Sequence, residues 1–136
     1  MNYSSIDPYT FFRGKAREAM EFYKNIFGGE LTTQAYGEGS APAQEGMKGK
    51  LMHAALSGGM ISLMASDTVQ ASEKAAKISL SLGGSDEEKL TTIFNGLSED
   101  VEVQTPLKKE FWGDTFGQVT DKYGIEWMVN ISPKKE

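Results

Sequence analysis

The fold is decided by residues 9–29, which read YTFFRGKAREAMEFYKNIFGG. Residues 9–12 form a short aromatic run ended by Gly14, a pattern typical of a strand. Apolar residues then recur three and four positions apart, which predicts one face of an amphipathic helix: Ala16, Ala19, Met20, Tyr23, Ile26 and Phe27. Gly28 and Gly29 come next, and glycine there is typical of a left-handed C-terminal cap. The stretch therefore predicts a strand followed by a helix.

Three more strands are predicted in the first half of the chain, at residues 30–35, 51–56 and 60–65. A loop rich in Gly, Ala, Pro and Glu separates the first two of these strands. The last two flank Ser57-Gly58-Gly59, which is a hairpin turn signal. The order of the first half is therefore βαβββ.

The second half repeats this order after a linker predicted at residues 67–76. Strands are predicted at 77–82, 101–107, 113–120 and 125–131, with a turn at 121–124 before the last strand. A helix is predicted after the first of these strands, and its apolar face consists of Leu90, Ile93, Phe94 and Leu97. Ser85 and Glu88 have the spacing of a capping box, in which hydroxyl and carboxylate satisfy helix-start amides. The repeat predicts two tandem modules, approximately residues 8–66 and 77–131, within one domain of residues 1–136.

The predicted fold class is α+β. A single module would leave one sheet face exposed, which a stable domain avoids by packing layers together. We therefore expect the two βαβββ modules to form curved mixed sheets around a cleft, with the helices on the outer faces. Concave apolar sites are where proteins bury small molecules, so the cleft is the expected ligand site.

Composition excludes several classes of protein. The chain of 136 residues has no cysteine, which rules out disulfides and thiolate metal sites and favours a cytoplasmic location. Its net charge is -5 with Lys and Arg scattered, so we expect no nucleic-acid partner. No signal-peptide pattern and no apolar run of about 20 residues is present, so we expect no membrane partner.

Six stretches carry a resemblance to a known family: FFRGKAREAMEFY (11–23), KNIFGGE (24–30), MHA (52–54), LMASD (63–67), FWGDTFG (111–117) and TDKYGIEWMVN (120–130). The first resembles the opening strand and helix of the vicinal oxygen chelate (glyoxalase/bleomycin resistance/extradiol dioxygenase) superfamily. The others narrow the resemblance to its PhnB-like branch. The resemblance implies a single glyoxalase-like domain and a homodimer. It does not choose an activity, because the superfamily hosts isomerases, dioxygenases, thiol transferases and metal-free drug-binding proteins.

Catalytic members of that superfamily hold one divalent metal with His, Glu or Gln from four strands. The corresponding places here hold residues that make poor ligands: Pro8, Ala55, Lys77 and Met128. Only His53 and Glu126 remain nearby, and a stable site usually takes at least three protein ligands. We therefore expect no cofactor, and Zn, Ni, Mn or Fe held through His53 and Glu126 is the alternative.

Strand alternation assigns faces to the candidate residues. His53 and Ala55 are expected to share the cleft face, opposite Met52, Ala54 and Leu56, and Glu126 and Met128 lie opposite Trp127. The residues predicted to line the cleft are Thr10, Phe12, His53, Trp112, Glu126 and Met128, with Ser79 and Ser81 as further candidates opposite the apolar Ile78, Leu80 and Leu82.

His53 and Glu126 form the best chemical pair in the sequence, with Glu126 as a candidate general base. Ordinary structural roles remain open for each residue. His53 fits a hydrogen-bonded, partly buried histidine, Glu126 fits a solvated or paired carboxylate, and Trp112 fits core or dimer packing.

Three functions remain open from the sequence. The first is a homodimer that binds a small molecule in an apolar cleft without a complete catalytic metal site. The second is a divalent-metal-dependent lyase, isomerase or dioxygenase that uses His53 and Glu126. The third is a structural or interaction dimer without ligand chemistry.

Overall fold

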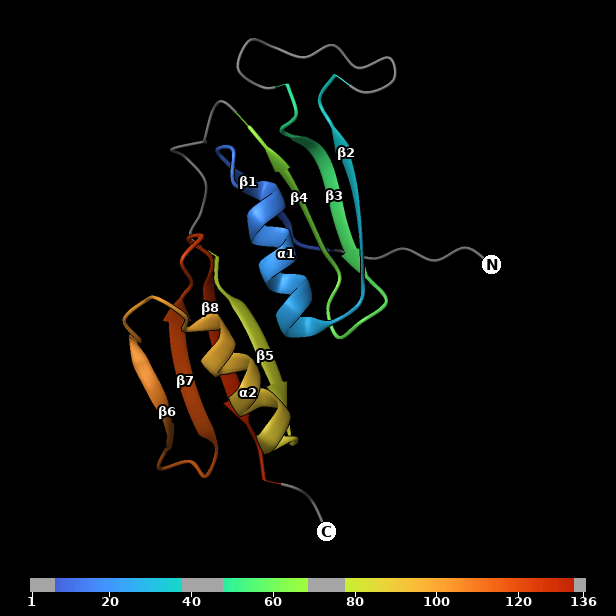
Figure 1. Cartoon of the computed structure of the whole chain (residues 1–136). Helices are drawn as coiled ribbons and strands as arrows, with labels where there is room; N and C mark the ends of the chain where they lie inside the picture. The colour runs from blue at the N-terminus through green and yellow to red at the C-terminus, as the bar shows by residue number, and fades with distance from the viewer. Residues whose placement is uncertain (1–6, 38–47, 69–77, 134–136) are drawn as a thin grey trace. The chain divides into compact units, whose positions relative to one another are not determined.

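The structure is a computed structural model that describes residues 7–37, 48–68 and 78–133. The chain divides into two compact units, Met1–Glu73 and Lys74–Glu136. The first unit contains β1 (Tyr9–Phe12), α1 (Ala16–Phe27), β2 (Glu30–Ala35), β3 (Leu51–Ser57) and β4 (Leu63–Asp67). The second contains β5 (Leu80–Gly84), α2 (Glu87–Leu97), β6 (Thr105–Lys109), β7 (Thr115–Thr120) and β8 (Glu126–Ile131). The predicted α+β fold with two βαβββ modules is confirmed (Figure 1).

Each unit has one four-stranded mixed sheet. The strand orders are β1-β4-β3-β2 and β5-β8-β7-β6, and in each sheet the first two strands of that order are parallel and the other neighbours are antiparallel. In each unit the single helix packs against its own sheet (Figure 1). On the opposite face of each sheet, the described residues of its unit form no helix, and we call it the uncovered face. A cleft enclosed by the two sheets remains a prediction.

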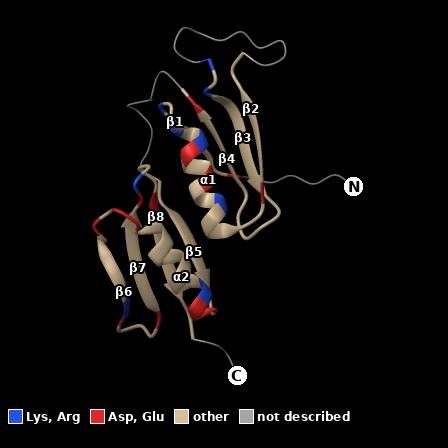
Figure 2. Ribbon diagram, in the orientation of Figure 1, with Lys and Arg blue, Asp and Glu red and all other residues tan. Residues whose placement is uncertain are grey.

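The helices bury the faces that their periodicity predicts. In α1 the buried residues are Ala16, Ala19, Met20, Tyr23 and Phe27, and in α2 they are Leu90, Ile93, Phe94 and Leu97. Charged residues occur along α1, at the start of α2 and near strand ends (Figure 2). Hydrophobic burial against the sheet therefore stabilises both helices.

The end of α1 differs from the predicted left-handed cap. Gly28 has φ 77° and ψ -171°, so its φ is positive as expected, but its ψ lies outside the left-handed helical region. Only glycine adopts this conformation readily, and it turns the chain directly into β2.

A buried carboxylate joins three elements of the first unit. Asp67, at the end of β4, is 1% exposed. Its Oδ1 accepts the backbone N–H groups of Gly14 and Ala16, each at 2.9 Å, and its Oδ2 accepts that of Leu51 at 2.9 Å. Asp67 thus fixes the start of α1 and the start of β3. Its assignment to the linker was wrong, because it belongs to β4.

The turn between β3 and β4 is longer than predicted, because β4 begins at Leu63 and not at residue 60. This turn lies against the end of α1. A Cβ added to Gly29 would come 2.6 Å from the Ser57 carbonyl oxygen, and one added to Gly59 would come 2.8 Å from the Gly28 carbonyl oxygen. Both contacts are with backbone atoms, so the approach requires glycine on both sides.

Several boundaries in the second unit also differ from the predictions. β5 begins at Leu80, and Ile78, predicted as core, is 75% exposed; residue 77 lies outside the described residues. β6 and β7 begin at Thr105 and Thr115, later than predicted. The Lys108–Phe116 and Thr105–Gln118 pairs lie on either side of a register shift, which alternation alone does not reveal.

The cap of α2 is Asp86, one residue after the predicted Ser85. The Asp86 side chain accepts the backbone N–H of Lys89 at 3.1 Å. The predicted capping box was therefore wrong. The run Ser85-Asp86 offers two good capping residues, and the chain uses the second.

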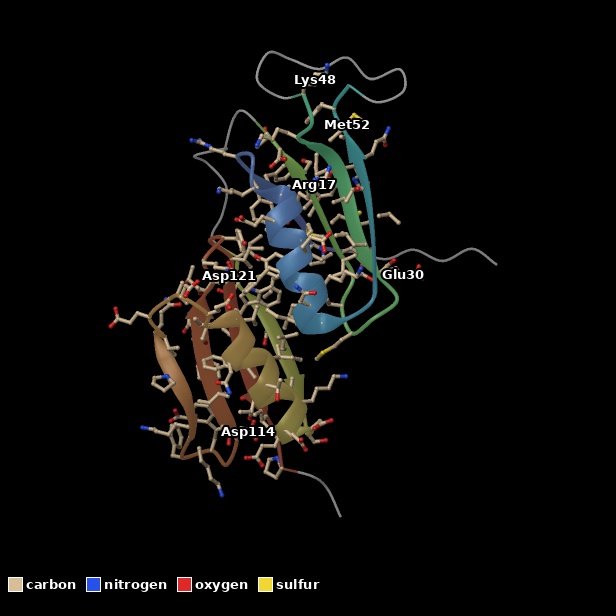
Figure 3. The ribbon with its side chains drawn as sticks, viewed as in Figure 1. Arg17, Glu30, Lys48, Met52, Asp114 and Asp121 are labelled. Atoms are coloured by element: carbon tan, nitrogen blue, oxygen red, sulfur yellow. The ribbon has the colours of Figure 1, made fainter. Side chains whose placement is uncertain are left out.

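The predicted turn at residues 121–124 is confirmed, and a second buried carboxylate holds it. Asp121 is 3% exposed. Its Oδ1 accepts the backbone N–H groups of Tyr123 at 2.8 Å and Ile125 at 3.1 Å, and its Oδ2 accepts Nε1–H of Trp127 at 2.7 Å. Asp114 and Asp121 lie near opposite ends of β7 (Figure 3).

Among the described residues, no helix combines the length and the apolar character needed to cross a membrane.

Candidate functional site

The uncovered face of the first sheet is defined by the strand registers. Tyr9 pairs with Met64, Met64 with Ala55, and Ala55 with Thr32. Paired residues point to the same face, and alternation adds a second set to it. The residues that share this face are Tyr9, Phe11, Glu30, Thr32, Gln34, His53, Ala55, Ser57, Met64 and Ser66. Most of them are aromatic, apolar or uncharged polar residues, with one histidine and, where β2 begins, the carboxylate of Glu30.

Tyr9 and His53 meet across this face. The Tyr9 hydroxyl lies 3.1 Å from Nδ1 of His53, and the two rings are 5.8 Å apart between centroids. The two residues belong to β1 and β3, which β4 separates, so the strands are about 9.5 Å apart and only a long side chain spans them. Phe11 packs beside Tyr9 at 5.1 Å and is 63% exposed.

The face predicted for the first strand was wrong. Thr10 pairs with Ala65, which is fully buried on the helix-covered face. The Thr10 hydroxyl donates a hydrogen bond to the Met64 carbonyl oxygen. Phe12, two residues on, is 7% exposed. Thr10 and Phe12 therefore do not share a face with His53. The strand carries aromatic residues of both parities, so alternation could not decide between them.

The face predicted for His53 on β3 is correct, whereas the face predicted for Met52 needs correction. Gln34 pairs with His53 and Ala35 with Leu51, so a register shift lies between them. The shift interrupts the alternation. Leu51 is fully buried, whereas Met52, predicted to pack under the helix, is half-buried near the start of the strand (Figure 3).

The uncovered face of the second sheet has the alternation predicted for β8. Trp127 and Val129 are fully buried, while Glu126, Met128 and Asn130 are partly exposed. Met128 pairs with Ser81 on one side and Gln118 on the other. The predicted face of Ser81, Glu126 and Met128 is therefore confirmed within this unit.

Glu126 is held by two neighbours. Its Oε1 accepts a hydrogen bond from Nε2 of Gln118 at 2.8 Å and another from the Ser79 hydroxyl. Hydrogen bonds to the ionised form stabilise a carboxylate, so both donors oppose its use as a general base. The sequence analysis did not single out Gln118. It lies two residues before Thr120, which pairs with Glu126, so strand alternation places it on the same face.

Trp112 lies in the turn between β6 and β7. It is 51% exposed and packs edge-on against Phe111 at 5.0 Å and Phe116 at 6.4 Å. Phe116 pairs with Asn130 on the uncovered face. Trp112 therefore lies beside that face and not in the core of its unit.

Neither unit assembles a metal site from its described residues. No group of three or more His, Cys, Asp or Glu side chains gathers among them. His53 belongs to the first unit and Glu126 to the second, so their predicted proximity remains a prediction. Within each unit the donor set falls short of the three protein ligands that a divalent ion usually takes.

Comparisons with known proteins agree with this architecture. Protein PA1353 from Pseudomonas aeruginosa is 37% identical, with a TM-score of 0.83 over 97% of this chain and 100% of that one. A PhnB protein from Bacillus cereus, described as a putative 3-demethylubiquinone-9 3-methyltransferase, is 27% identical, with a TM-score of 0.76 over 95% and 100%.

Protein YjdN from Escherichia coli (strain K12) is 25% identical over 138 residues, which span 93% of this chain and 94% of YjdN. These relatives confirm the likeness to the PhnB-like branch. Residues 5–129 match the model of one family. The chain belongs to the Glyoxalase/Bleomycin resistance protein/Dioxygenase superfamily.

Proposed function

We propose that the chain binds a small organic molecule against the uncovered faces of its sheets, without a complete catalytic metal site. The observation that carries this proposal is the cluster of Tyr9, Phe11 and His53. Two exposed rings and a ring nitrogen lie together on a face whose one carboxylate among the strand residues, Glu30, is at the start of β2. Apolar surface with a few placed polar groups is the usual composition of a small-molecule site.

Phe11 is the strongest single indication of a ligand surface. A phenylalanine exposed to 63% forgoes much of the free energy that burying its ring would give. A ligand that covers Phe11 and Tyr9 recovers part of that free energy. Glu126, Met128 and Trp112 supply a comparable mixture of acceptor, apolar and aromatic groups in the second unit.

The proposal is tested by titrating the ¹⁵N-labelled, chelator-treated, untagged protein with aromatic drugs and small phosphorylated metabolites. We expect a subset to shift amide signals of the uncovered faces with saturation. Phe11→Ala is expected to weaken such binding roughly 5- to 30-fold, because about 1–2 kcal/mol of ring contact is lost. Binding that perturbs only other surfaces, or none at all, would contradict the proposal.

The alternative is a divalent-metal-dependent lyase, isomerase or dioxygenase that uses His53 and Glu126. One observation favours it: Nδ1 of His53 faces the Tyr9 hydroxyl, and metal-binding histidines commonly engage a partner through their second nitrogen. Under this alternative, His53→Ala abolishes metal uptake. Under the main proposal, the metal content of the protein is the same with and without that substitution.

A cytoplasmic homodimer completes the proposal. The PhnB-like resemblance supports the dimer, and the absence of cysteine supports a reducing compartment. Nucleic acid and membranes are not proposed as partners, because the net charge is -5 and the described helices are too short to cross a bilayer.

A further inference from the structure

The contact between Tyr9 and His53 bears on which nitrogen of His53 carries the proton. A neutral imidazole has one N–H donor and one bare acceptor nitrogen, and the partner of one nitrogen sets the state of the other. The Tyr9 hydroxyl lies 3.1 Å from Nδ1. A phenol hydroxyl is a stronger acid than a neutral imidazole N–H, so the better hydrogen bond has the phenol donating to a bare Nδ1.

The remaining nitrogen then carries the proton. Nε2 of His53 makes no hydrogen bond with the described residues, and the ring is only partly buried. Gln34 pairs directly with His53 on β2, is exposed, and adds an amide donor to the same face. The result is two N–H donor groups on neighbouring strands of the face that also carries Phe11.

The surroundings favour a ligand that accepts hydrogen bonds. Glu30 is the one carboxylate among the strand residues that share the uncovered face of the first sheet, and it lies four residues before Gln34, roughly 13 Å along β2. An anionic or carbonyl oxygen at His53 therefore meets no adjacent carboxylate on this face. Tyr9 and Phe11 supply flat apolar surface next to the donors. A planar aromatic body with a carboxylate, phosphoryl or carbonyl oxygen matches both features.

We propose that Tyr9 is a positioning residue that holds His53 in its Nε2–H form, which makes this face selective for aromatic ligands carrying an oxygen acceptor. The inference rests on the proposed small-molecule function and adds the ligand class. It also separates the two functions above. A bare Nε2 is what a metal ligand requires, whereas a protonated Nε2 requires an acceptor on the ligand.

The test uses the single histidine of the chain, whose ring signals need no assignment in untagged protein. Long-range ¹H–¹⁵N spectra distinguish protonated from bare imidazole nitrogens when the ring is neutral. We expect Nδ1 bare and Nε2 protonated. Tyr9→Phe should produce a mixture of the two forms, and Tyr36→Phe should not. Tyr36 is the matched control because its hydroxyl donates to the Asp67 carbonyl oxygen of the same unit.

Ligand class is tested with benzoate and benzamidine, which share a planar ring and differ in offering an acceptor or a donor. Benzoate should shift the Nε2 signal, and Tyr9→Phe should weaken its binding roughly 2- to 10-fold, as expected for one hydrogen bond. Benzamidine should leave the signal unchanged.

Four results would overturn the inference. A protonated Nδ1 in the unaltered protein, or an unchanged tautomer in Tyr9→Phe, would remove the positioning role of Tyr9. An equal response to benzamidine would remove the ligand class. Failure of both probes and of the wider ligand set to bind would refute the proposed function together with the inference, whereas the other three results leave binding itself intact.

Discussion

Two buried aspartates show how single residues hold each unit together. Asp67 in the first unit and Asp121 in the second are each almost fully buried, and each accepts three hydrogen bonds from N–H groups. A buried carboxylate is costly unless its oxygens are satisfied, and here the chain satisfies them with N–H groups from nearby segments. Asp67 therefore ties the start of α1 to the sheet, and Asp121 closes the turn between β7 and β8.

Asp67→Asn is expected to lower the free energy of unfolding by about 2–3 kcal/mol. An amide oxygen replaces only part of the carboxylate, and the new NH₂ group faces N–H donors that lose their acceptor. Urea denaturation monitored by circular dichroism measures the change. Asp86→Asn is the matched control, because asparagine caps a helix as well as aspartate does. Equal losses in both variants, or a loss below about 0.5 kcal/mol in Asp67→Asn, would refute this role of Asp67.

The candidate site residues were predictable where alternation is clean and not where it is ambiguous. Glu126 and Met128 lie in a strand whose apolar and polar residues alternate, and their face was predicted correctly. Thr10 and Phe12 lie in a strand with aromatic residues of both parities, and their face was wrong. The partner of His53 is on a strand 44 residues earlier, so no local pattern could reveal it.

At the scale of elements, helix α1 and the β3–β4 turn are joined by glycines. A Cβ on Gly59 would meet the Gly28 carbonyl carbon and oxygen at 2.8 Å, and backbone atoms cannot rotate away as a side chain can. The sequence shows Gly-Gly pairs at 28–29 and 58–59, and these were interpreted as a cap and a turn. The contact between Gly28-Gly29 and Gly58-Gly59 depends on the tertiary fold, which local sequence patterns do not reveal.

Gly59→Ala is expected to destabilise the protein by about 1–3 kcal/mol, the usual cost of overpacking. Gly83→Ala is the control: its added Cβ would meet only the Asn130 carbonyl oxygen at 3.9 Å, an ordinary contact. Thermal unfolding of both variants provides the comparison. A midpoint for Gly59→Ala equal to that of Gly83→Ala would show that the close approach is absent in solution.

The start of α2 gives a test of the corrected cap. Asp86→Ala should cost about 1 kcal/mol of stability, since it removes the acceptor of the Lys89 N–H. Ser85→Ala should change stability by less than about 0.5 kcal/mol, as expected for an exposed residue away from the cap. Guanidinium denaturation measures the free energy of unfolding of the two single variants. A larger loss in Ser85→Ala than in Asp86→Ala would show that Ser85 caps the helix, as the sequence predicted.

At the scale of the whole molecule, the sequence predicted the architecture well because the βαβββ order occurs twice. Each copy supports the interpretation of the other, so errors at the starts of β4, β5, β6 and β7 did not change the fold class. The activity could not be predicted in the same way. A fold that serves many chemistries leaves function to the site, and the site here depends on long-range pairs such as Tyr9 and His53.

The proposed homodimer predicts a sedimentation mass twice that of one chain at micromolar concentration. Exposed Phe111 and Trp112 give the second unit apolar surface of the kind that association covers. Analytical ultracentrifugation of untagged protein across a dilution series measures the mass. A single-chain mass throughout the series would refute the dimer and leave the binding proposal standing.

The central claim is that the chain handles small molecules without a complete metal site. Its most direct test is elemental analysis of untagged protein after incubation with excess Zn, Ni, Mn and Fe(II) and desalting. We expect far less than one metal per chain, because the described residues bring together no three suitable ligands. Close to one metal per chain, lost in His53→Ala, would contradict the claim and establish the metal-dependent alternative.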